Sequence, residues 1–223
     1  TALSTIYIFR KNITEIISGL ISRKKEEVDF SVKIIISMIP AVIVGLLWED
    51  SIKHLFNEDS NLIQQTFGGA LTFVGLMLII TSILLFFADK SKPTNKNVSF
   101  LSSLIIGLSQ AIAILPGISR SGATISTSVL LGIDKEKSTK FSFLMVVPLI
   151  LGKITKDVLF EKIEFSSSDS LPILFGFISS FIVGIFACTL MIKIVKNSKL
   201  RYFAYYCILI AFTIILFDIY DPS

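Results

Sequence analysis

The sequence has few charged residues for its length. Only 17% of its 223 residues are Asp, Glu, Lys or Arg, whereas soluble domains average about 25%. Three long stretches carry no charge at all, residues 60–88, 97–119 and 170–192. About 20 apolar residues are enough to cross the hydrocarbon core of a bilayer. This distribution excludes an ordinary soluble domain and predicts a multi-pass membrane protein.

Histidine and cysteine are scarce as well. With a single histidine, His54, the sequence excludes a histidine-rich metal cluster. His54 lies beside acidic residues in a polar connection, so we interpret it as a solvated side chain. The two cysteines, Cys188 and Cys207, lie inside apolar runs, which indicates small packing residues rather than a disulfide or a metal pair.

The net charge of +4 is modest, and the Lys and Arg residues gather in short segments between apolar runs. This pattern is typical of the cytoplasmic connections of a membrane protein. No nucleic-acid partner is therefore predicted.

The first residues, 1–9, read as the tail of an apolar helix. No charged segment and cleavage site accompany them, so they are not a signal peptide. We expect residues 1–9 to be the remnant of a helix whose earlier part precedes Thr1 in the natural protein.

The apolar runs predict an all-α, polytopic fold with about five to six transmembrane helices in one membrane domain, residues 1–223. The expected crossings are residues 34–48, 67–88, 141–160, 171–192 and 202–217. Residues 98–133 are also apolar, but Pro116 and Gly117 interrupt them, and the part that follows is too short to cross alone.

The charges of the connections favour a re-entrant hairpin at residues 98–133. Basic connections lie on the cytoplasmic side of most membrane proteins. If residues 98–133 crossed once, the lysines of residues 134–140 and the basic connection at 193–201 would both fall outside. If the segment enters the membrane and returns, every basic connection is cytoplasmic and every acidic one is external. We therefore expect a hairpin whose tip lies at membrane depth.

The tip of this hairpin, residues 116–122, carries an arginine where a charge is costly. An unpaired arginine inside a membrane is expensive, so such a site indicates function. Arg120 offers a planar fork that matches two phosphate oxygens. Glycines, hydroxyls and the start of a helix at about residue 122 would surround it and favour an anion. The expected phosphate site consists of Gly117, Ser119, Arg120, Ser121, Gly122 and Thr124.

Other interpretations of these polar residues stay open at this point. Arg120 could only snorkel to the interface or pair with a carboxylate. Gln110 and Ser142 are weaker candidates, because a polar residue that joins two helices is the commoner explanation for each.

A family resemblance is carried by the motif PGISRSGATIS at residues 116–126, followed by FSFL at 141–144 and by Pro148. Together they resemble the second signature of the undecaprenyl-diphosphatase family, the bacitracin-resistance type. Gln110 and the segment IPAVIVGLL at 39–47 resemble that family too. The resemblance covers essentially the whole chain.

The resemblance implies an enzyme of the bacterial inner membrane that hydrolyses undecaprenyl diphosphate to undecaprenyl phosphate and phosphate. This reaction recycles the lipid carrier for peptidoglycan synthesis and confers bacitracin resistance. The resemblance also implies two inverted repeats, each with a re-entrant hairpin, and a site facing the periplasm. By the same resemblance Arg120 corresponds to the family's phosphate-binding arginine, and Ser119 and Ser121 correspond to its neighbouring hydroxyls. We expect Arg120 and Ser119 to be catalytic, with Ser119 as a hydrogen-bond donor or a nucleophile. The expected substrate-binding residues are Gly117, Ser121, Gly122, Thr124 and Gln110.

One signature of the family is absent. Its first, glutamate-rich segment ends in a Ser-Ser-Thr-Gly-His run and supplies the expected metal ligands and acid–base groups. Glu49, Asp50 and His54 match neither its position nor its spacing. We therefore expect that the first repeat's hairpin is missing and that Mg²⁺ or Ca²⁺ is held by residues before Thr1, with no metal ligand in this chain. The chain alone is then expected to be inactive.

A lipid-phosphate or anion transporter with inverted repeats is the alternative function, because its broken helices and mid-membrane anion site would look the same. The acid-phosphatase-like lipid phosphatases are excluded, since no histidine follows Arg120. The expected partners are the lipid substrate and the bilayer, and a homodimer stays an open alternative.

Overall fold

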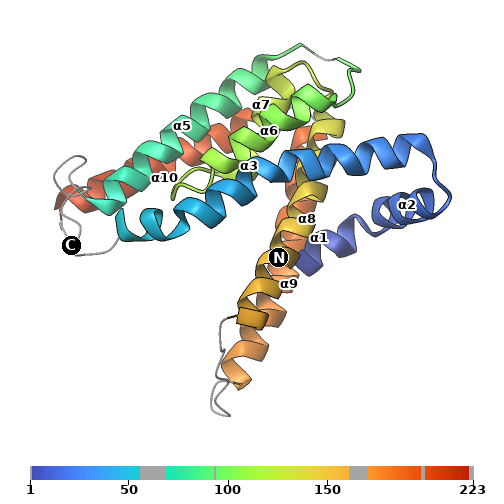
Figure 1. Cartoon of the computed structure of the whole chain (residues 1–223). Coiled ribbons are helices and arrows are strands. Elements are labelled where there is room, and N and C mark those ends of the chain that lie inside the picture. Colours follow the sequence, from blue (N-terminus) through green and yellow to red (C-terminus); the bar gives the residue numbers. More distant parts are fainter. Residues whose placement is uncertain (1, 56–68, 93, 161–169, 197–198, 221–223) are drawn as a thin grey trace.

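The computed structural model describes residues 2–55, 69–92, 94–160, 170–196 and 199–220. The regular structure of these ranges is helical (Figure 1). The helices are α1 (Ala2–Ile8), α2 (Arg10–Ile21), α3 (Lys25–Leu55), α5 (Ala70–Lys90), α6 (Phe100–Ile112), α7 (Arg120–Leu130), α8 (Lys135–Phe160), α9 (Ser170–Lys196) and α10 (Arg201–Tyr220). The predicted all-α class is confirmed.

Five of the described helices are long and apolar enough to cross a membrane. They cover Lys25–Trp48, Ala70–Lys90, Lys135–Lys156, Leu171–Lys196 and Arg201–Tyr220, whereas α6 is a shorter apolar helix. Many of their large apolar side chains face outward, and Phe186 of α9 is 70% exposed. An apolar surface of this extent is the one that lipid covers in a membrane protein. The predicted polytopic architecture is therefore confirmed.

The basic segment before the first expected crossing, residues 10–33, is mostly helical. Residues 10–21 form α2, and α3 starts at Lys25 rather than at about residue 34. Glu26 and Glu27 lie in the first turn of α3. Acidic side chains stabilise the amino end of a helix through its dipole, so the helix begins well before its apolar part.

The charged turn expected at residues 134–140 is mostly the first part of α8. The Asp134 carboxylate accepts hydrogen bonds from the amides of Glu136 and Lys137, each at 3.0 Å. A carboxylate in this position caps a helix by satisfying amides that have no partner inside it. The cap lets α8 start among charged residues, which hydropathy alone does not reveal.

The helices form two groups that diverge from one end of the molecule. Figure 1 shows α3, α5, α6 and α10 running side by side, whereas α8 and α9 run away from them toward the bottom of the view. Helix α5 packs along α10, and α3 packs on α6. Helix α7 contacts α5, α6 and α8, so it is one of the elements that join the two groups.

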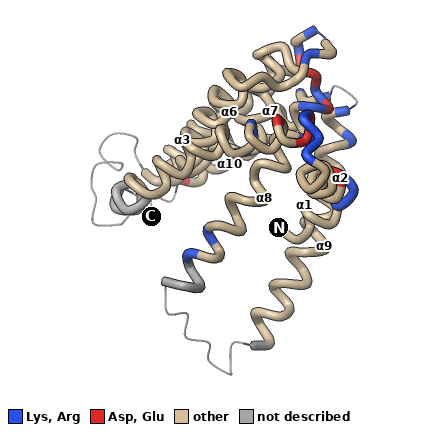
Figure 2. Tube along the Cα trace, turned by 45° about the vertical axis from the view of Figure 1, so that its right-hand side comes forward, with Lys and Arg blue, Asp and Glu red and all other residues tan. Residues whose placement is uncertain are grey.

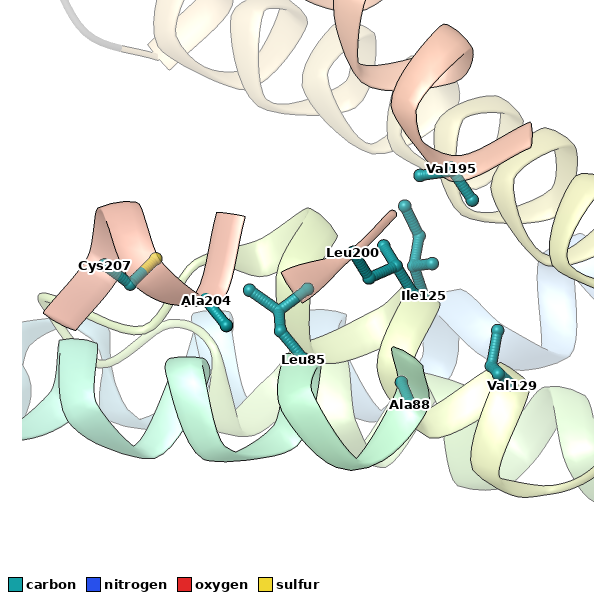
Figure 3. Packing of buried hydrophobic residues seen from close by; sticks show 8 residues of the cluster. All are labelled: Leu85, Ala88, Ile125, Val129, Val195, Leu200, Ala204 and Cys207. Carbon is teal, nitrogen blue, oxygen red and sulfur yellow. The ribbon is translucent and has the colours of Figure 1, made fainter. Parts of the chain in front are cut away.

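A hydrophobic core holds α7 in place at the junction of these helices (Figure 3). Ile125 and Val129 of α7 are its buried contribution, and Ile125 is fully buried. The other members come from α5 and from the region where α9 ends and α10 begins: Leu85, Ala88, Val195, Leu200, Ala204 and Cys207. Cys207 and Cys188 are buried free thiols, as predicted.

The two ends of the segment 98–133 lie side by side. Lys96 and Ile133 form an isolated β-bridge, and the amide of Asp134 donates to the carbonyl of Lys96 at 3.1 Å. The Lys96 ammonium donates to the carbonyl of Leu131 at 3.2 Å. The segment therefore folds back on itself, and its first and last residues lie at the same end of the molecule.

Most Lys and Arg residues gather at one end of the molecule (Figure 2). Contacts between connections hold this end together. Lys137 Nζ donates to the carbonyl of Asn95 at 2.9 Å, and Lys196 pairs with Glu136 at 2.6 Å. Segments that are far apart in sequence thus bring their positive charges together, which is the arrangement expected of connections that share the cytoplasmic side.

Candidate functional site

The loop between α6 and α7 rests against the middle of α5. Gly117 adopts φ +92°, a left-handed conformation that favours glycine. A Cβ atom at Gly117 would lie 2.5 Å from the carbonyl oxygen of Val74. Two residues later, the amide of Ser119 donates to Thr81 Oγ1 at 3.1 Å. Because Thr81 lies near the midpoint of α5 (Ala70–Lys90), the loop sits level with the centre of that helix.

Helix α7 begins at Arg120, earlier than the expected start near residue 122. Ser119 is its N-cap: the hydroxyl oxygen accepts the amide N–H of Gly122 at 3.2 Å, and the carbonyl accepts that of Ala123 at 2.8 Å. A serine cap satisfies amides that have no partner in the helix. The early start puts Arg120 and Ser121 in the first turn, so their amides are the ones that an anion in front of the helix can reach.

A glycine at position 122 allows either a positive φ or a close backbone approach. Gly122 lies inside α7 without a positive φ. A Cβ atom at Gly122 would lie 2.9 Å from Thr81 Cγ2. The missing side chain instead allows α7 to approach α5 closely.

Arg120 lines a cavity of about 640 Å³. Its walls come from α3, the end of α6 and α8, and are largely apolar: they include Met38, Val42, Leu46, Ile114, Pro148 and Ile154. Ligand sites of proteins usually have volumes of about 300–1,000 Å³ and a few polar groups on apolar walls. The half-buried guanidinium of Arg120 is such a polar group.

Gln110 lines the same cavity. Its side chain is 1% exposed, and among the described residues neither its amide nitrogen nor its amide oxygen has a hydrogen-bond partner. An unsatisfied buried amide costs about 1–3 kcal/mol. The idea that Gln110 joins two helices therefore finds no hydrogen bond within the described part of the chain. The predicted contact of Gln110 with substrate stays a prediction.

The other open interpretation of Arg120 is an ion pair with a carboxylate. Within the ranges that the structure describes, no acidic side chain lies at ion-pair distance from Arg120. The guanidinium shares its cavity with an amide and apolar walls. An anion that enters the cavity would meet a cation that is not paired with any acidic side chain of the described residues.

Thr124 and Ser142 join two helices. Their hydroxyls are within hydrogen-bond distance of each other, and Thr124 Oγ1 also donates to the carbonyl of Arg120 at 2.9 Å. A second pair, Ser128 and Ser138, repeats this contact between α7 and α8 at 2.8 Å. Thr124 is fully buried. Its hydroxyl orients the first turn of α7, and its predicted contact with substrate stays a prediction.

Among the predicted site residues, Arg120 and Gln110 line the cavity. Gly117, Ser119, Ser121, Gly122 and Thr124 form the loop and the helix start beside Arg120. The structure thus brings the predicted residues into one region through the fold of a single segment and its packing on α5.

Two cavity residues were not identified from the sequence. Lys153 and Lys156 of α8 line the same cavity as Arg120, although their place near the end of an apolar run indicated only a polar helix end. The signal was their spacing of three residues, which puts both lysines on neighbouring positions of a helix surface.

Metal ligands are expected from the family resemblance. Among the described residues, no group of three or more His, Cys, Asp or Glu side chains could hold a metal ion. The side chains of Glu49, Asp50 and His54 lie outside the described residues. The described part of the chain by itself does not fit a divalent cation.

Comparisons with known proteins find relatives that all carry the name undecaprenyl-diphosphatase. The undecaprenyl-diphosphatase of Christiangramia forsetii is 56% identical over 218 residues, which cover 97% of this chain and 78% of that protein. That of Bacteroides fragilis is 43% identical over 215 residues, 94% of this chain and 77% of the relative. That of Methanococcus maripaludis is 36% identical over 220 residues, 97% of this chain and 81% of the relative.

The family model described as "Bacitracin resistance protein BacA" matches residues 1–213. This match includes the arginine loop, the cavity-lining parts of α3 and α8, and the Thr124–Ser142 contact. The resemblance inferred from the motif at residues 116–126 is thereby confirmed. The chain belongs to the bacitracin resistance protein BacA family.

Proposed function

We propose that this chain acts in the hydrolysis of undecaprenyl diphosphate to undecaprenyl phosphate and inorganic phosphate. The reaction recycles the lipid carrier of peptidoglycan synthesis and confers bacitracin resistance. The relatives are named undecaprenyl-diphosphatases, and the matching family is named for bacitracin resistance. The structural observation that carries the proposal is Arg120 at the start of α7, open to a cavity of about 640 Å³ with apolar walls. Such a cavity suits a phosphorylated lipid.

In this proposal Arg120 binds the phosphoryl group. The planar guanidinium donates two parallel hydrogen bonds to two phosphate oxygens. The amino end of α7 adds its dipole and the amides of Arg120 and Ser121. Charge that develops on the transferring phosphoryl group is then met by donors that are already in position, which is the main catalytic term in phosphoryl transfer.

Ser119 contributes a hydrogen bond in this proposal. Its hydroxyl oxygen accepts the amide N–H of Gly122, so the hydroxyl hydrogen is left to donate to a phosphate oxygen. A serine nucleophile would need a base within hydrogen-bond reach. The Ser119 side chain is instead held in place as a helix cap, which favours the role of donor.

Gln110 lines the cavity near the end of α6 and supplies an amide in this proposal. Both polar atoms of this side chain lack partners in the described ranges, so a bound phosphate or its attacking water can take up its hydrogen bonds. The gain on binding is large, because a ligand that satisfies a buried amide removes a penalty of about 1–3 kcal/mol.

The acid–base groups and the metal ion form a separate part of the proposal. A divalent cation, Mg²⁺ or Ca²⁺, supplies charge stabilisation when bound. Its ligands are proposed to belong to the glutamate-rich signature that the resemblance implies, because no group of three or more metal-binding side chains occurs among the described residues. The 223-residue chain by itself is accordingly proposed to be inactive.

The protein is a multi-pass membrane protein, and the family belongs to the bacterial inner membrane. The site is proposed to face the exterior. Helix α8 starts in the basic end of the molecule at Lys135 and lines the cavity from Pro148 to Lys156. The cavity therefore extends away from the end that the positive-inside rule assigns to the cytoplasm.

The direct test is phosphate release from undecaprenyl diphosphate by the complete purified protein, with Arg120→Ala as the comparison. We expect steady release by the wild type and loss of it in the variant. The transporter alternative is not favoured by the relatives' names. It would be supported if the protein moved the lipid across vesicles and released no phosphate.

A further inference from the structure

The cavity that holds Arg120 has a second cationic part. Lys153 and Lys156 line it from α8, beyond Pro148. At a rise of 1.5 Å per residue they lie about 7.5 and 12 Å further along the helix than Pro148. The cavity thus carries positive charge beside the loop and again toward the outer end of α8.

Two lysines within a membrane-spanning helix are unusual, because a charged side chain costs free energy inside a bilayer. Cationic side chains in such helices normally face a wet cavity or another protein segment and mark the path of an anion or a proton. Lysines that only snorkel would lie against lipid with their heads at the interface. Lys153 and Lys156 are exposed and lie close to the end of the apolar span, and they also line the cavity.

Both lysines also interact with other residues of the chain. This does not remove them as ligands, because an ammonium group carries three donor hydrogens. One hydrogen can hold an internal partner while another is donated to a phosphate oxygen. Their flexible stems allow the ammonium groups to follow a group that moves along the cavity.

We propose that Lys153 and Lys156 form a second phosphoryl-binding subsite in the Arg120 cavity. This inference rests on the proposed function and deepens it. Arg120 and Gln110 bind the phosphoryl group at the loop, and the two lysines bind a second one toward the outer end. The second group is either the other phosphoryl group of the diphosphate substrate or inorganic phosphate on its way out.

The chemistry of a diphosphate explains why a second cationic subsite is useful. The substrate carries two adjacent anionic groups, and a single guanidinium cannot neutralise both. After hydrolysis the two product phosphates repel each other, and a cationic wall stabilises the one that departs. The wall of the cavity that α3 contributes is apolar (Met38, Val42, Leu46) and suits the prenyl chain of the substrate.

The test uses the complete protein with the double substitution Lys153→Gln and Lys156→Gln. Lys193→Gln serves as the matched control, because Lys193 is an exposed lysine of α9, a helix that does not contribute to the cavity wall. The double Lys→Arg variant keeps both charges and checks for a folding defect. We measure KM and kcat with undecaprenyl diphosphate, and inhibition of turnover by inorganic phosphate.

If the lysines hold the second phosphoryl group of the substrate, KM rises about ten-fold, which corresponds to about 1.4 kcal/mol, while kcat stays near wild type. If they hold departing phosphate, the inhibition constant of inorganic phosphate rises by a similar factor while KM does not change. The Lys→Arg variant should restore either constant. Values for the Lys→Gln double variant that equal those of Lys193→Gln in both measurements overturn the inference.

A binding measurement separates this inference from the proposed function. Titration of the protein with inorganic pyrophosphate, followed by calorimetry, needs no turnover. Weaker binding of pyrophosphate by the double Lys→Gln variant supports the subsite even if the wild type releases no phosphate from the lipid, a result that would overturn the proposed function alone. Equal binding of pyrophosphate by wild type and variant, together with an unchanged inhibition constant of inorganic phosphate, overturns the subsite and leaves the proposed function standing.

Discussion

The carboxylate of Asp218, near the end of α10, accepts the amide N–H and the hydroxyl of Thr72 in the first turn of α5. The amide nitrogen lies 3.0 Å from Asp218 Oδ2, and the Asp218 side chain is 5% exposed. Gly69 leaves room for it, since a Cβ atom there would lie 2.5 Å from the same oxygen. One acidic side chain thus caps the helix on which the arginine loop rests.

Replacing Asp218 should therefore loosen the support of the site. We expect Asp218→Ala to lower the free energy of unfolding by about 1–3 kcal/mol, because it leaves the half-buried amide and hydroxyl of Thr72 without their acceptor. Asp218→Asn, which keeps an acceptor oxygen, should cost less. Thermal unfolding in detergent measures the change. Thr213→Ala on the same helix is the control, since the Thr213 hydroxyl donates to the carbonyl of Leu209 in the preceding turn of α10. An equal loss of stability in this control would contradict the capping role of Asp218.

Arg120→Lys should abolish most of the activity. A lysine keeps the charge but cannot form the two parallel hydrogen bonds of a guanidinium, and a charge-assisted hydrogen bond is worth about 1.5–3 kcal/mol. We expect kcat/KM for undecaprenyl diphosphate to fall about ten- to hundred-fold in the complete protein. Lys193→Gln should have no such effect. Near-normal turnover by the Arg120→Lys variant would contradict phosphate binding by the guanidinium and would indicate that Arg120 only supports the structure.

Gln110→Leu should separate binding from stability. The substitution removes a buried amide without partners among the described residues, so the thermal midpoint should stay level or rise. KM for the lipid substrate should rise about ten-fold, because a hydrogen bond to the ligand is lost. The neighbouring Ser109→Ala, whose hydroxyl bonds Ile106 within α6, should change neither quantity. A drop in the melting temperature of Gln110→Leu with unchanged KM would indicate that Gln110 only supports the fold.

Gly117→Ala should disturb the loop through the backbone. A Cβ atom would lie 2.5 Å from the carbonyl of Val74, and the residue has φ +92°. Both effects penalise a side chain, and strained residues of this kind cost about 1–3 kcal/mol. We expect lower thermal stability and a lower kcat, because Arg120 moves with the loop. Gly176→Ala in α9, where the added Cβ meets nothing within 4 Å, should be neutral.

The fold-back of residues 98–133 predicts from which side of the membrane each connection can be labelled. Lys137 contacts Asn95 across the base of this segment, so cysteines introduced at Lys137 and Lys199 should react only from the cytoplasmic side. A cysteine at Glu164 should react only from outside. A membrane-impermeant maleimide added to intact cells and to inverted vesicles reads this out. Labelling of positions 137 and 164 from the same side would contradict the re-entrant topology.

Much of the fold could be predicted because hydrophobic length is a local property. The apolar runs at residues 67–88 and 202–217 correspond to α5 and α10 within a few residues. The start of α3 at Lys25 was missed, because its helix signal comes from the acidic first turn rather than from hydropathy. The start of α7 was missed for a related reason, since it is decided by the Ser119 cap.

The sequence by itself determined that the chain lies in a membrane, that an arginine loop interrupts an apolar segment, and which family signature this loop matches. These properties belong to short stretches of residues. Only the tertiary structure decided that Gln110 lies buried on the wall of the Arg120 cavity, and that Lys153 and Lys156 line the same cavity. The reason is physical: the direction in which a helix presents its polar residues is set by the helices that pack against its other faces, and those helices come from distant parts of the chain.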